Sequence, residues 1–321
     1  MSKLCVLAYS GGLDTSVCAA WLKEERGFDV IALTIDVGQT TELDGVALRA
    51  EAAGVADLVV ADAREEFVSE FCWPALRANA LYEGRYPLVS ALSRPLIARR
   101  LVRLARERGA VAVAHGCTGK GNDQVRFETS IAALAPDLEI LAPIRETGMQ
   151  RDQALAYAKE RDIPVVATAE KPYSVDENLW GRAVESGVLE DPWAAPPAKD
   201  VYELTADPDE APDAPDDVVI TFEAGTPVAL DGEPKAPVEL VGELDARAGR
   251  HGVGRIDMIE NRLVGIKSRE VYEVPAATAL IAAHRDLEGL VLERDVARFK
   301  RQTEDRYADL VYNGLWFSPL R

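Results

Sequence analysis

The feature that most constrains the fold lies in the first 25 residues, where an apolar run, a glycine-rich turn and an apolar-periodic stretch follow one another. Leu4–Ala8 predicts a buried strand, the turn reads Ser10-Gly-Gly-Leu-Asp-Thr-Ser16, and residues 13–25 predict a helix. Glycines lack a Cβ, so the backbone can bend sharply and direct its N–H groups toward an anion. A helix beginning near Asp14 adds unpaired N–H groups and the positive end of its dipole. The turn therefore predicts a site for a nucleotide phosphate.

Two common phosphate motifs do not fit this turn. A Walker P-loop requires a lysine after its last glycine, and a dinucleotide fingerprint requires G-x-G-x-x-G. The turn has neither, but Ser10, Thr15 and Ser16 add hydroxyl donors. The remaining pattern, S-G-G-x-D-[ST]-S, resembles the loop of enzymes that split ATP between its α- and β-phosphates. The plain alternative is an ordinary strand-to-helix turn.

Strands and helices alternate through the first half of the chain. The expected strands are Leu4–Ala8, Asp29–Asp36, Ala56–Ala61, Val111–His115, Glu139–Ala142 and Val165–Ala167. The expected helices are 13–25, Leu43–Ala53, Leu92–Arg108 and Arg151–Arg161. This alternation predicts an α/β fold with a parallel sheet and helices on both faces. Ligands of such sheets bind at the carboxyl ends of the strands, so the loops that begin at Ser10 and His115 are expected to face one crevice.

The pattern changes after about residue 168. Pro192–Pro197 and Thr205–Asp217 are rich in proline and acid, and they predict extended surface loops. The β-like runs that follow are Val218–Glu223, Thr226–Leu230 with a hairpin turn at Asp231-Gly232, and Arg262–Ile266. Leu287–Tyr312 predicts one long helix at the end. We therefore expect two domains, 1–168 and 169–321, the second of the α+β class.

Composition narrows the range of partners. A chain of 321 residues suits about two domains, and 54 acidic against 36 basic residues give a net charge of −18. That balance argues against a nucleic-acid surface, which needs a basic stripe. The sequence has no apolar run of membrane-spanning length and no signal-peptide pattern, so we expect no membrane partner. Four cysteines without C-x-x-C spacing favour a reducing cytoplasm.

A second informative segment is His115-Gly-Cys-Thr-Gly-Lys-Gly-Asn-Asp-Gln-Val-Arg-Phe127. Its three glycines permit a tight loop against a ligand, and five polar side chains of different chemistry stand close together. Lys120 is a candidate for neutralising phosphate charge. His115 can titrate near neutrality, but we expect a structural role for it at the end of the strand. The plain alternative for the whole segment is a polar surface loop.

Together these two motifs resemble the argininosuccinate synthase family. Further segments match the family in order along nearly the whole chain. They are Leu81-Tyr-Glu-Gly-Arg-Tyr86, Tyr173-Ser-Val-Asp-Glu-Asn178, His251-Gly-Val-Gly-Arg-Ile-Asp257 and Lys267-Ser-Arg-Glu-Val-Tyr272. The resemblance implies a PP-loop domain of the adenine nucleotide alpha hydrolase type, followed by a synthetase domain.

The resemblance also implies the reaction. The ureido oxygen of citrulline attacks the α-phosphate of ATP to give citrullyl-AMP and pyrophosphate, and the amine of aspartate then displaces AMP. No protein nucleophile is required, so catalysis consists of positioning and charge stabilisation. Magnesium is expected with the ATP, and the sequence contains no evident metal cage. The partners are the small-molecule substrates, and the family forms homotetramers.

The resemblance assigns site residues as follows. ATP would be held by Ala8, Tyr9, Ser10, Gly11, Gly12, Leu13, Asp14, Thr15, Ser16, Ile35 and Gly116. Citrulline would be held by Tyr86, Asn122, Arg126, Ser174, Glu260 and Tyr272, and aspartate by Ser90, Thr118, Asn122 and Asp123. Catalytic roles would fall to Asp14, Asp123 and Arg126. Asp123 is suited to orient the amine of aspartate, and the fork of Arg126 to pair with a substrate carboxylate. Taken singly, the tyrosines could be packing residues, and Glu260 and Arg126 surface ions.

The sequence departs from the family at several positions. Ser90 stands where many relatives have threonine, and it keeps the hydroxyl. Ala91 and Ala183 stand where some relatives have serines that contact citrulline, so those contacts are not carried over. The family usually continues beyond Trp316–Arg321 into a segment that reaches a neighbouring subunit, and we expect a weakened or absent tetramer without it.

Two alternatives remain open at this point. One is a related ATP-splitting ligase that acts on another carbonyl or urea-like acceptor. The other is a regulatory protein that binds ATP without turnover. The presence of Asp14, Asp123, Arg126 and Glu260 argues against loss of activity.

Overall fold

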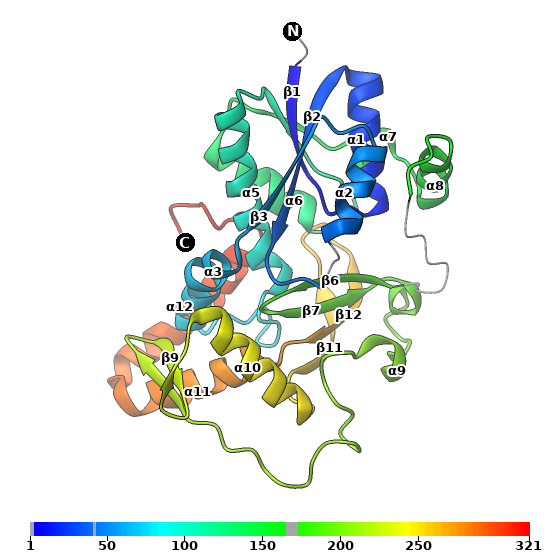
Figure 1. The fold of residues 1–321 in the computed structure, drawn as a ribbon. Helices are drawn as coiled ribbons and strands as arrows, with labels where there is room; N and C mark the ends of the chain where they lie inside the picture. The colour runs from blue at the N-terminus through cyan, green and yellow to red at the C-terminus, as the bar shows by residue number, and fades with distance from the viewer. Residues whose placement is uncertain (1–2, 41–42, 165–172) are drawn as a thin grey trace.

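A computed structural model describes residues 3–40, 43–164 and 173–321 (Figure 1). The strand expected at Val165–Ala167 lies outside the described residues. No helix of the described ranges is both long enough and apolar enough to cross a membrane.

The first half is a parallel α/β unit, as the alternating pattern predicts. Its strands are β1 (Lys3–Ala8), β2 (Phe28–Asp36), β3 (Asp57–Asp62), β4 (Ala112–Ala114) and β5 (Glu139–Leu141). Its helices are α1 (Leu13–Arg26), α2 (Leu43–Ala52), α3 (Arg64–Phe67), the π-helical turn η1 (Val68–Cys72), α4 (Trp73–Arg77), α5 (Val89–Arg108), α6 (Asp123–Leu134), α7 (Pro143–Thr147) and α8 (Arg151–Lys159). The strands lie side by side in the order β3-β2-β1-β4-β5, and every pairing in this sheet is parallel.

Side chains on β1 alternate between two apolar layers. Val6 packs in the cluster that contains the α5 residues, whereas Cys5 and Leu7 pack in the cluster that contains the α1 residues. Helices therefore cover both faces of the sheet, with α1 and α2 on one side and α5 and α6 on the other (Figure 1). The chain leaves β1 toward β2 and later returns to β4 on its other side, so a crevice is expected beyond the carboxyl ends of β1 and β4.

The second half is an α+β unit with two antiparallel sheets. One sheet has the order β11-β12-β7-β6 and the other β10-β9-β8. The strands are β6 (Ser174–Asn178), β7 (Gly181–Glu185), β8 (Ile220–Glu223), β9 (Thr226–Leu230), β10 (Glu233–Pro234), β11 (Arg255–Asn261) and β12 (Lys267–Glu273). The helices are the 3-10 turn η2 (Gly187–Glu190), α9 (Ala198–Val201), α10 (Pro237–Arg250), α11 (Pro275–Val291) and α12 (Arg294–Tyr312). The hairpin turn expected at Asp231-Gly232 is confirmed between β9 and β10.

Two expectations for the second half are wrong. Arg262–Ile266 is the turn between β11 and β12 rather than a strand, and Gly265 takes a positive φ of 83° there. The long helix expected over Leu287–Tyr312 is broken at Leu292, where the backbone is extended. Glu293 begins a new helix because its carboxylate accepts the N–H groups of the first turn of α12.

Candidate active site

The turn after β1 has the geometry of an anion site. Gly11 has φ +75°, a conformation that favours glycine, and Gly12 immediately precedes α1. The Ser10 hydroxyl accepts the N–H of Gly12 at 3.3 Å and lies 3.2 Å from the Thr15 hydroxyl. Among the described residues no side chain caps α1, so the start of the helix is open to a negatively charged ligand. Asp14 lies in this first turn, and burial raises the pKa of its carboxyl although Arg151 opposes the rise.

Several residues expected to bind ATP support the turn through buried side chains. Tyr9, Ser16 and Ile35 are buried, and the Tyr9 hydroxyl lies 2.9 Å from that of Ser16. The Thr34 hydroxyl donates to the Tyr9 carbonyl at 2.8 Å, which fixes the end of β1 against β2. The side chains of these residues therefore shape the loop, while the exposed edge consists of Ser10, Gly12 and the start of α1.

The loop after β4 adjoins the loop after β1, as the sequence predicts. A Cβ on Gly116 would lie 3.0 Å from Cγ2 of Thr15 and 3.3 Å from its backbone nitrogen. His115 is buried at the end of β4, where its Nδ1 accepts the Cys117 N–H at 3.2 Å. This is the structural role expected for it. Lys120 is exposed on the same loop.

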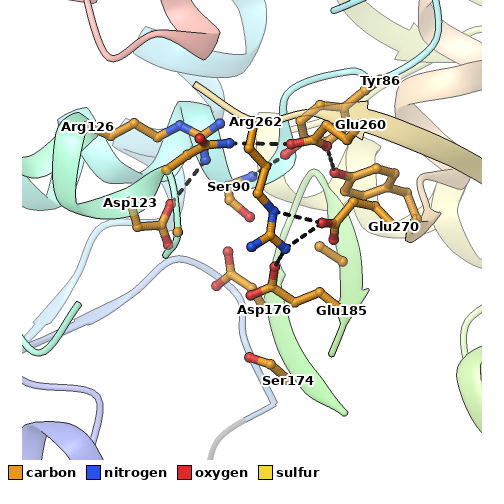
Figure 2. A pocket seen from close by; sticks show the side chains of 14 residues that line it. Tyr86, Ser90, Asp123, Arg126, Ser174, Asp176, Glu185, Glu260, Arg262 and Glu270 are labelled. Carbon is orange, nitrogen blue, oxygen red and sulfur yellow. Dashed lines mark hydrogen bonds and ion pairs between the residues drawn. The ribbon is translucent and has the colours of Figure 1, made fainter. Parts of the chain in front are cut away.

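A pocket lies between the two halves of the chain (Figure 2). Its walls come from α5, the start of α6, and the strands β6, β7, β11 and β12. Its lining residues are Tyr86, Ser90, Gly121, Asn122, Asp123, Arg126, Ser174, Asp176, Ala183, Glu185, Glu260, Arg262, Glu270 and Tyr272. The structure thus brings together every residue expected to hold citrulline and three of the four expected to hold aspartate. Thr118 lies on the exposed loop before α6 and is not among the described residues of the lining.

Asp123 forms the centre of an ion-pair network on one wall of the pocket. Its Oδ2 accepts from Arg94 at 2.9 and 2.7 Å, and its Oδ1 accepts from Arg126 at 3.0 Å. Arg94 also donates to Asp176 of β6 at 2.8 Å, so the network joins the two halves. Burial alone would raise the pKa of Asp123, but the two guanidinium groups hold it below its ordinary value. Asp123 is therefore a charged acceptor at neutral pH.

Arg126 is 4% exposed, and one of its three guanidinium nitrogens has no hydrogen-bond partner among the described residues. Its Nε donates to the Tyr312 carbonyl at 3.0 Å and its Nη1 to Asp123. Its Nη2 is buried and has no hydrogen-bond partner within the described part of the chain. An unpartnered buried donor is costly, so this geometry favours an acceptor on a bound ligand. The expectation of a surface ion does not hold for this residue.

Glu260 of β11 is also buried. Its Oε2 accepts the hydroxyl of Tyr272, and its Oε1 lies 3.4 Å from Nδ2 of Asn122. The Tyr272 ring stacks on that of Tyr86 with the centroids 4.1 Å apart. The Tyr86 hydroxyl accepts the N–H of Ser90 at 3.0 Å. The two tyrosines therefore act both as packing aromatics and as holders of polar pocket groups.

A second ion-pair cluster closes the pocket beside β7 and β12. Arg262, from the β11–β12 turn, donates to Glu185 at 2.5 Å and to Glu270 at 2.6 Å (Figure 2). Burial, together with the charges of Glu185 and Glu260, raises the pKa of Glu270 to about 7, although Arg262 opposes the rise. Burial likewise raises the pKa of Glu185. This wall has more acids than cations, which suits an ammonium group on a ligand.

The sequence analysis missed five polar residues around the pocket. They are Arg94, Asp176, Glu185, Arg262 and Glu270. Arg94 follows Ser90 by four residues on α5, the spacing that places two side chains on one helix face. The helix expected from the sequence begins at Leu92, so it contains Arg94 and leaves out Ser90. Asp176 and Glu270 lie inside motifs that were already recognised. Glu185 lies on β7, a strand that the sequence pattern did not reveal, and Arg262 lies in the β11–β12 turn, which was expected to be a strand.

The pocket also bears on the alanine substitutions. Ala183 lines the pocket and offers no side-chain donor, whereas Ala91 is buried in the core. In the ranges that the structure describes, no cluster of three or more His, Cys, Asp or Glu residues is arranged to hold a metal ion.

Two solved structures are similar to parts of this chain. A 4-thiouridine synthetase in complex with RNA and bound ATP is 20% identical, with a TM-score of 0.37 over 50% of this chain and 40% of that one. A "predicted subunit of tRNA methyltransferase from Methanocaldococcus jannaschii DSM" is 13% identical, with a TM-score of 0.34 over 55% of this chain and 78% of that one. This chain thus spans less than half the length of the first of these proteins.

Family models cover almost the whole chain. The arginosuccinate synthase N-terminal HUP domain matches residues 4–164, which contain the parallel sheet and the phosphate turn. The arginosuccinate synthase C-terminal domain matches residues 173–321, which contain both antiparallel sheets. The chain therefore belongs to the argininosuccinate synthase family of AMP-forming ligases.

Proposed function

We propose that this protein joins citrulline to aspartate at the expense of ATP, forming argininosuccinate, AMP and pyrophosphate in arginine biosynthesis. One observation carries the proposal beyond family membership. The six residues expected to hold citrulline line one pocket, although they come from segments between Tyr86 and Tyr272. That pocket includes the start of α6, and the loop before α6 adjoins the phosphate turn at Gly116 and Thr15.

The proposed chemistry has two steps. The ureido oxygen of citrulline forms a bond to the α-phosphorus of ATP, and the bond from that phosphorus to the pyrophosphate oxygen breaks. The amine nitrogen of aspartate then bonds to the ureido carbon, the carbon–oxygen bond to AMP breaks, and the amine loses a proton. Both steps need aligned reactants and compensated charge, and the pocket supplies these without a covalent protein intermediate.

We assign the pocket residues to the substrates by their chemistry. The free Nη2 of Arg126 suits the carboxylate of citrulline, and Glu260 suits its ammonium group. Asp123 stays charged beside Arg94 and Arg126, so its role is to orient the amine of aspartate rather than to remove a proton from it. Ser90, Asn122 and the exposed Thr118 complete the proposed aspartate site.

The turn after β1 would hold the ATP phosphates through backbone N–H groups and the Ser10 and Thr15 hydroxyls. Mg²⁺ that accompanies ATP needs only one or two protein carboxylates besides the phosphates. The half-buried Asp14 at the start of α1 fits that requirement. When bound, the ion would neutralise phosphate charge.

The proposal includes the domain division and the setting of the enzyme. We place the boundary near residue 168, between the two family matches, with the substrate pocket formed by both sides. A homo-oligomer in the cytoplasm is part of the proposal because the family forms homotetramers, and we expect the tetramer of this chain to be weakened or absent. Light scattering after size-exclusion chromatography tests the oligomeric state.

The deciding experiment measures pyrophosphate release with MgATP, with citrulline and aspartate each present or absent. We expect release that depends on citrulline, and argininosuccinate only when aspartate is added. Citrulline labelled with ¹⁸O in its ureido group should transfer the label to AMP, because that oxygen stays on the phosphorus. ATP binding without release in any combination would favour a regulatory protein, and release with a different acceptor would favour a related ligase.

A further inference from the structure

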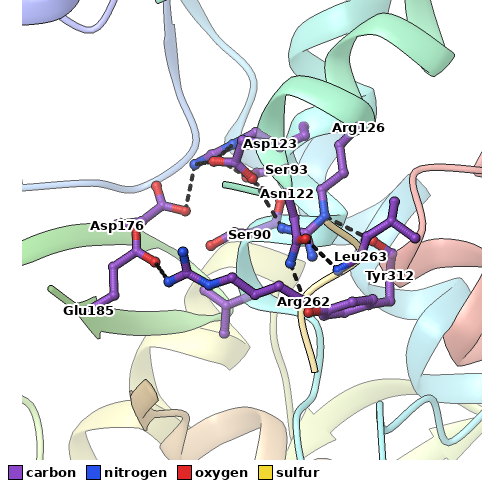
Figure 3. A network of polar contacts seen from close by, with 12 residues as sticks. Ser90, Ser93, Asn122, Asp123, Arg126, Asp176, Glu185, Arg262, Leu263 and Tyr312 are labelled. Atoms are coloured by element: carbon purple, nitrogen blue, oxygen red, sulfur yellow. Dashed lines mark hydrogen bonds and ion pairs between the residues drawn. The ribbon is translucent and has the colours of Figure 1, made fainter. Parts of the chain in front are cut away.

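Tyr312, the last residue of α12, reaches the substrate pocket from the far end of the sequence. It is fully buried, and its ring stacks face to face on Tyr82 with the centroids 3.5 Å apart. It lies behind the pocket lining, in contact with residues of α6 and β11 (Figure 3).

The Tyr312 hydroxyl connects two residues of the proposed citrulline site. It accepts a hydrogen bond from Nδ2 of Asn122 at 2.7 Å and donates its own proton to Oε1 of Glu260. Tyr272 donates to the other oxygen, Oε2, of the same carboxylate. Glu260 is therefore held at both oxygens, and rotation of its carboxylate would break one of the two bonds.

Tyr312 also holds Arg126, by two contacts that do not involve the hydroxyl. Its backbone carbonyl accepts the Nε proton of Arg126 at 3.0 Å, and the guanidinium carbon lies 4.8 Å from the centre of its ring. These contacts orient the fork so that Nη1 reaches Asp123 while Nη2 stays free.

The chain just after Tyr312 fixes this arrangement against α6. The Thr129 hydroxyl donates to the Gly314 carbonyl at 2.8 Å. A Cβ on Gly314 would lie 2.8 Å from Cα of Arg126, so the backbone approaches α6 as closely as only glycine permits. The chain after α12 is therefore packed directly against α6.

We propose that Tyr312 is a positioning residue for citrulline, which sets the orientations of Asn122, Arg126 and Glu260 together. This inference rests on the proposed function, because those three residues are the proposed contacts of citrulline. It assigns α12 a direct part in the site, although no residue of that helix lines the pocket.

The test is Tyr312→Phe, which removes the hydroxyl and keeps the ring and the backbone carbonyl. We expect the KM for citrulline to rise about tenfold, as for a lost hydrogen bond to a buried carboxylate. The KM for ATP should stay within twofold, since the hydrogen bonds and ring contacts of Tyr312 within the described residues go to other parts of the chain than the phosphate turn. Tyr307→Phe is the matched control because it removes a tyrosine hydroxyl from the same helix at a residue that does not line the pocket, and it should leave both KM values unchanged.

The outcomes separate this inference from the proposed function. If the unaltered protein releases no pyrophosphate with citrulline, the proposed function fails. If the unaltered protein is active and Tyr312→Phe changes the citrulline KM by less than twofold, the positioning role is wrong. Equal rises in the KM values for citrulline and ATP would also overturn it, since they indicate a general structural defect. KM does not depend on the concentration of folded enzyme, so partial unfolding of the variant leaves the test valid.

Discussion

The phosphate turn and the substrate pocket, which we propose to be two parts of one site, are encoded in different ways. The turn is built from nine consecutive residues, Ala8–Ser16, and acts mainly through backbone geometry and the start of α1. The pocket takes its residues from six helices and strands, from the loops before α5 and α6 and from the β11–β12 turn. Its side chains are paired across both halves of the chain. A site built from consecutive residues tolerates substitutions elsewhere in the protein. A site built from residues that are distant in sequence depends on each pairing between them.

We therefore expect a conservative substitution in the pocket to cause the largest loss of activity. Arg126→Lys replaces the guanidinium fork by a single ammonium group. The fork contacts Asp123 and the Tyr312 carbonyl, and its Nη2 has no partner among the described residues. We expect kcat/KM for citrulline to fall about 10³-fold, equivalent to about 4 kcal/mol, as for breaking a buried charge pair. Steady-state kinetics with pyrophosphate detection measures the loss.

The matched control is Arg106→Lys, an arginine of α5 whose partner, Asp137, is exposed. Surface ion pairs contribute about 0–1 kcal/mol, so this variant should keep its activity within twofold. A comparable loss in both variants, or an active Arg126→Lys enzyme, would contradict the proposed role of the guanidinium fork.

The difference between the two regions also explains what could be predicted from sequence. The strand-turn-helix unit at the start, the alternation of strands and helices through the described first half and the closeness of the two loops follow from local patterns, and the structure confirms them. The pocket residues were found through motif resemblance and not from periodicity. Arg94 and Tyr312 were missed because their partners, Asp123 and Glu260, are distant in sequence and a single sequence does not report such pairings.

The two structural errors have different physical causes. Arg262–Ile266 contains apolar residues that suit a strand, but tertiary pairing places the strands on either side and leaves this segment as the turn. The break at Leu292 within the expected long helix depends on the Glu293 cap, a local hydrogen-bond choice that competes with helix continuation. In both cases the boundary was decided by hydrogen bonds that the pattern of apolar residues does not report.

We expect ATP binding by the phosphate turn to be impaired by a substitution that changes the backbone conformation rather than by one that removes a side-chain contact. Gly11→Ala places an L-residue at φ +75° and a Cβ 2.9 Å from Cγ2 of Val46. We expect the KM for ATP to rise about 100-fold, because strain of about 2–3 kcal/mol would be relieved by distorting the turn. The KM for citrulline should change much less.

Gly27→Ala is the control, since Gly27 follows the other end of α1 with φ +66° and no atom within 4 Å of its Cβ position. It should lower the free energy of unfolding by about 1 kcal/mol and leave the KM for ATP unchanged. Thermal denaturation and kinetics on both variants make the comparison. An unchanged KM for ATP in Gly11→Ala would mean that the phosphates bind elsewhere.

The smallest expected effect concerns pH and the acidic wall of the pocket. Burial beside Glu185 and Glu260 raises the pKa of Glu270 from 4.5 to about 7. Between these pH values the folded protein binds more protons than the unfolded chain, so the free energy of unfolding falls as pH rises. The full destabilisation by the ionised Glu270 carboxylate is present above pH 7. Glu270→Gln removes this titration, so its stability relative to the unaltered protein should increase by about 2 kcal/mol from pH 5 to pH 8.

Urea denaturation of both proteins at pH 5, 6, 7 and 8 measures that difference, with exposed Glu210→Gln as the control for a lost surface charge. A difference that does not vary with pH would show that Arg262 fully compensates the carboxylates and that the wall has no excess charge. A difference that grows with pH would show that the pocket stores unfavourable negative charge in the absence of substrate. The ammonium group of citrulline would relieve that charge, so added citrulline should stabilise the unaltered protein more at pH 8 than at pH 5. The phosphate turn has no comparable acidic cluster, and stabilisation by ATP should lack this link to Glu270.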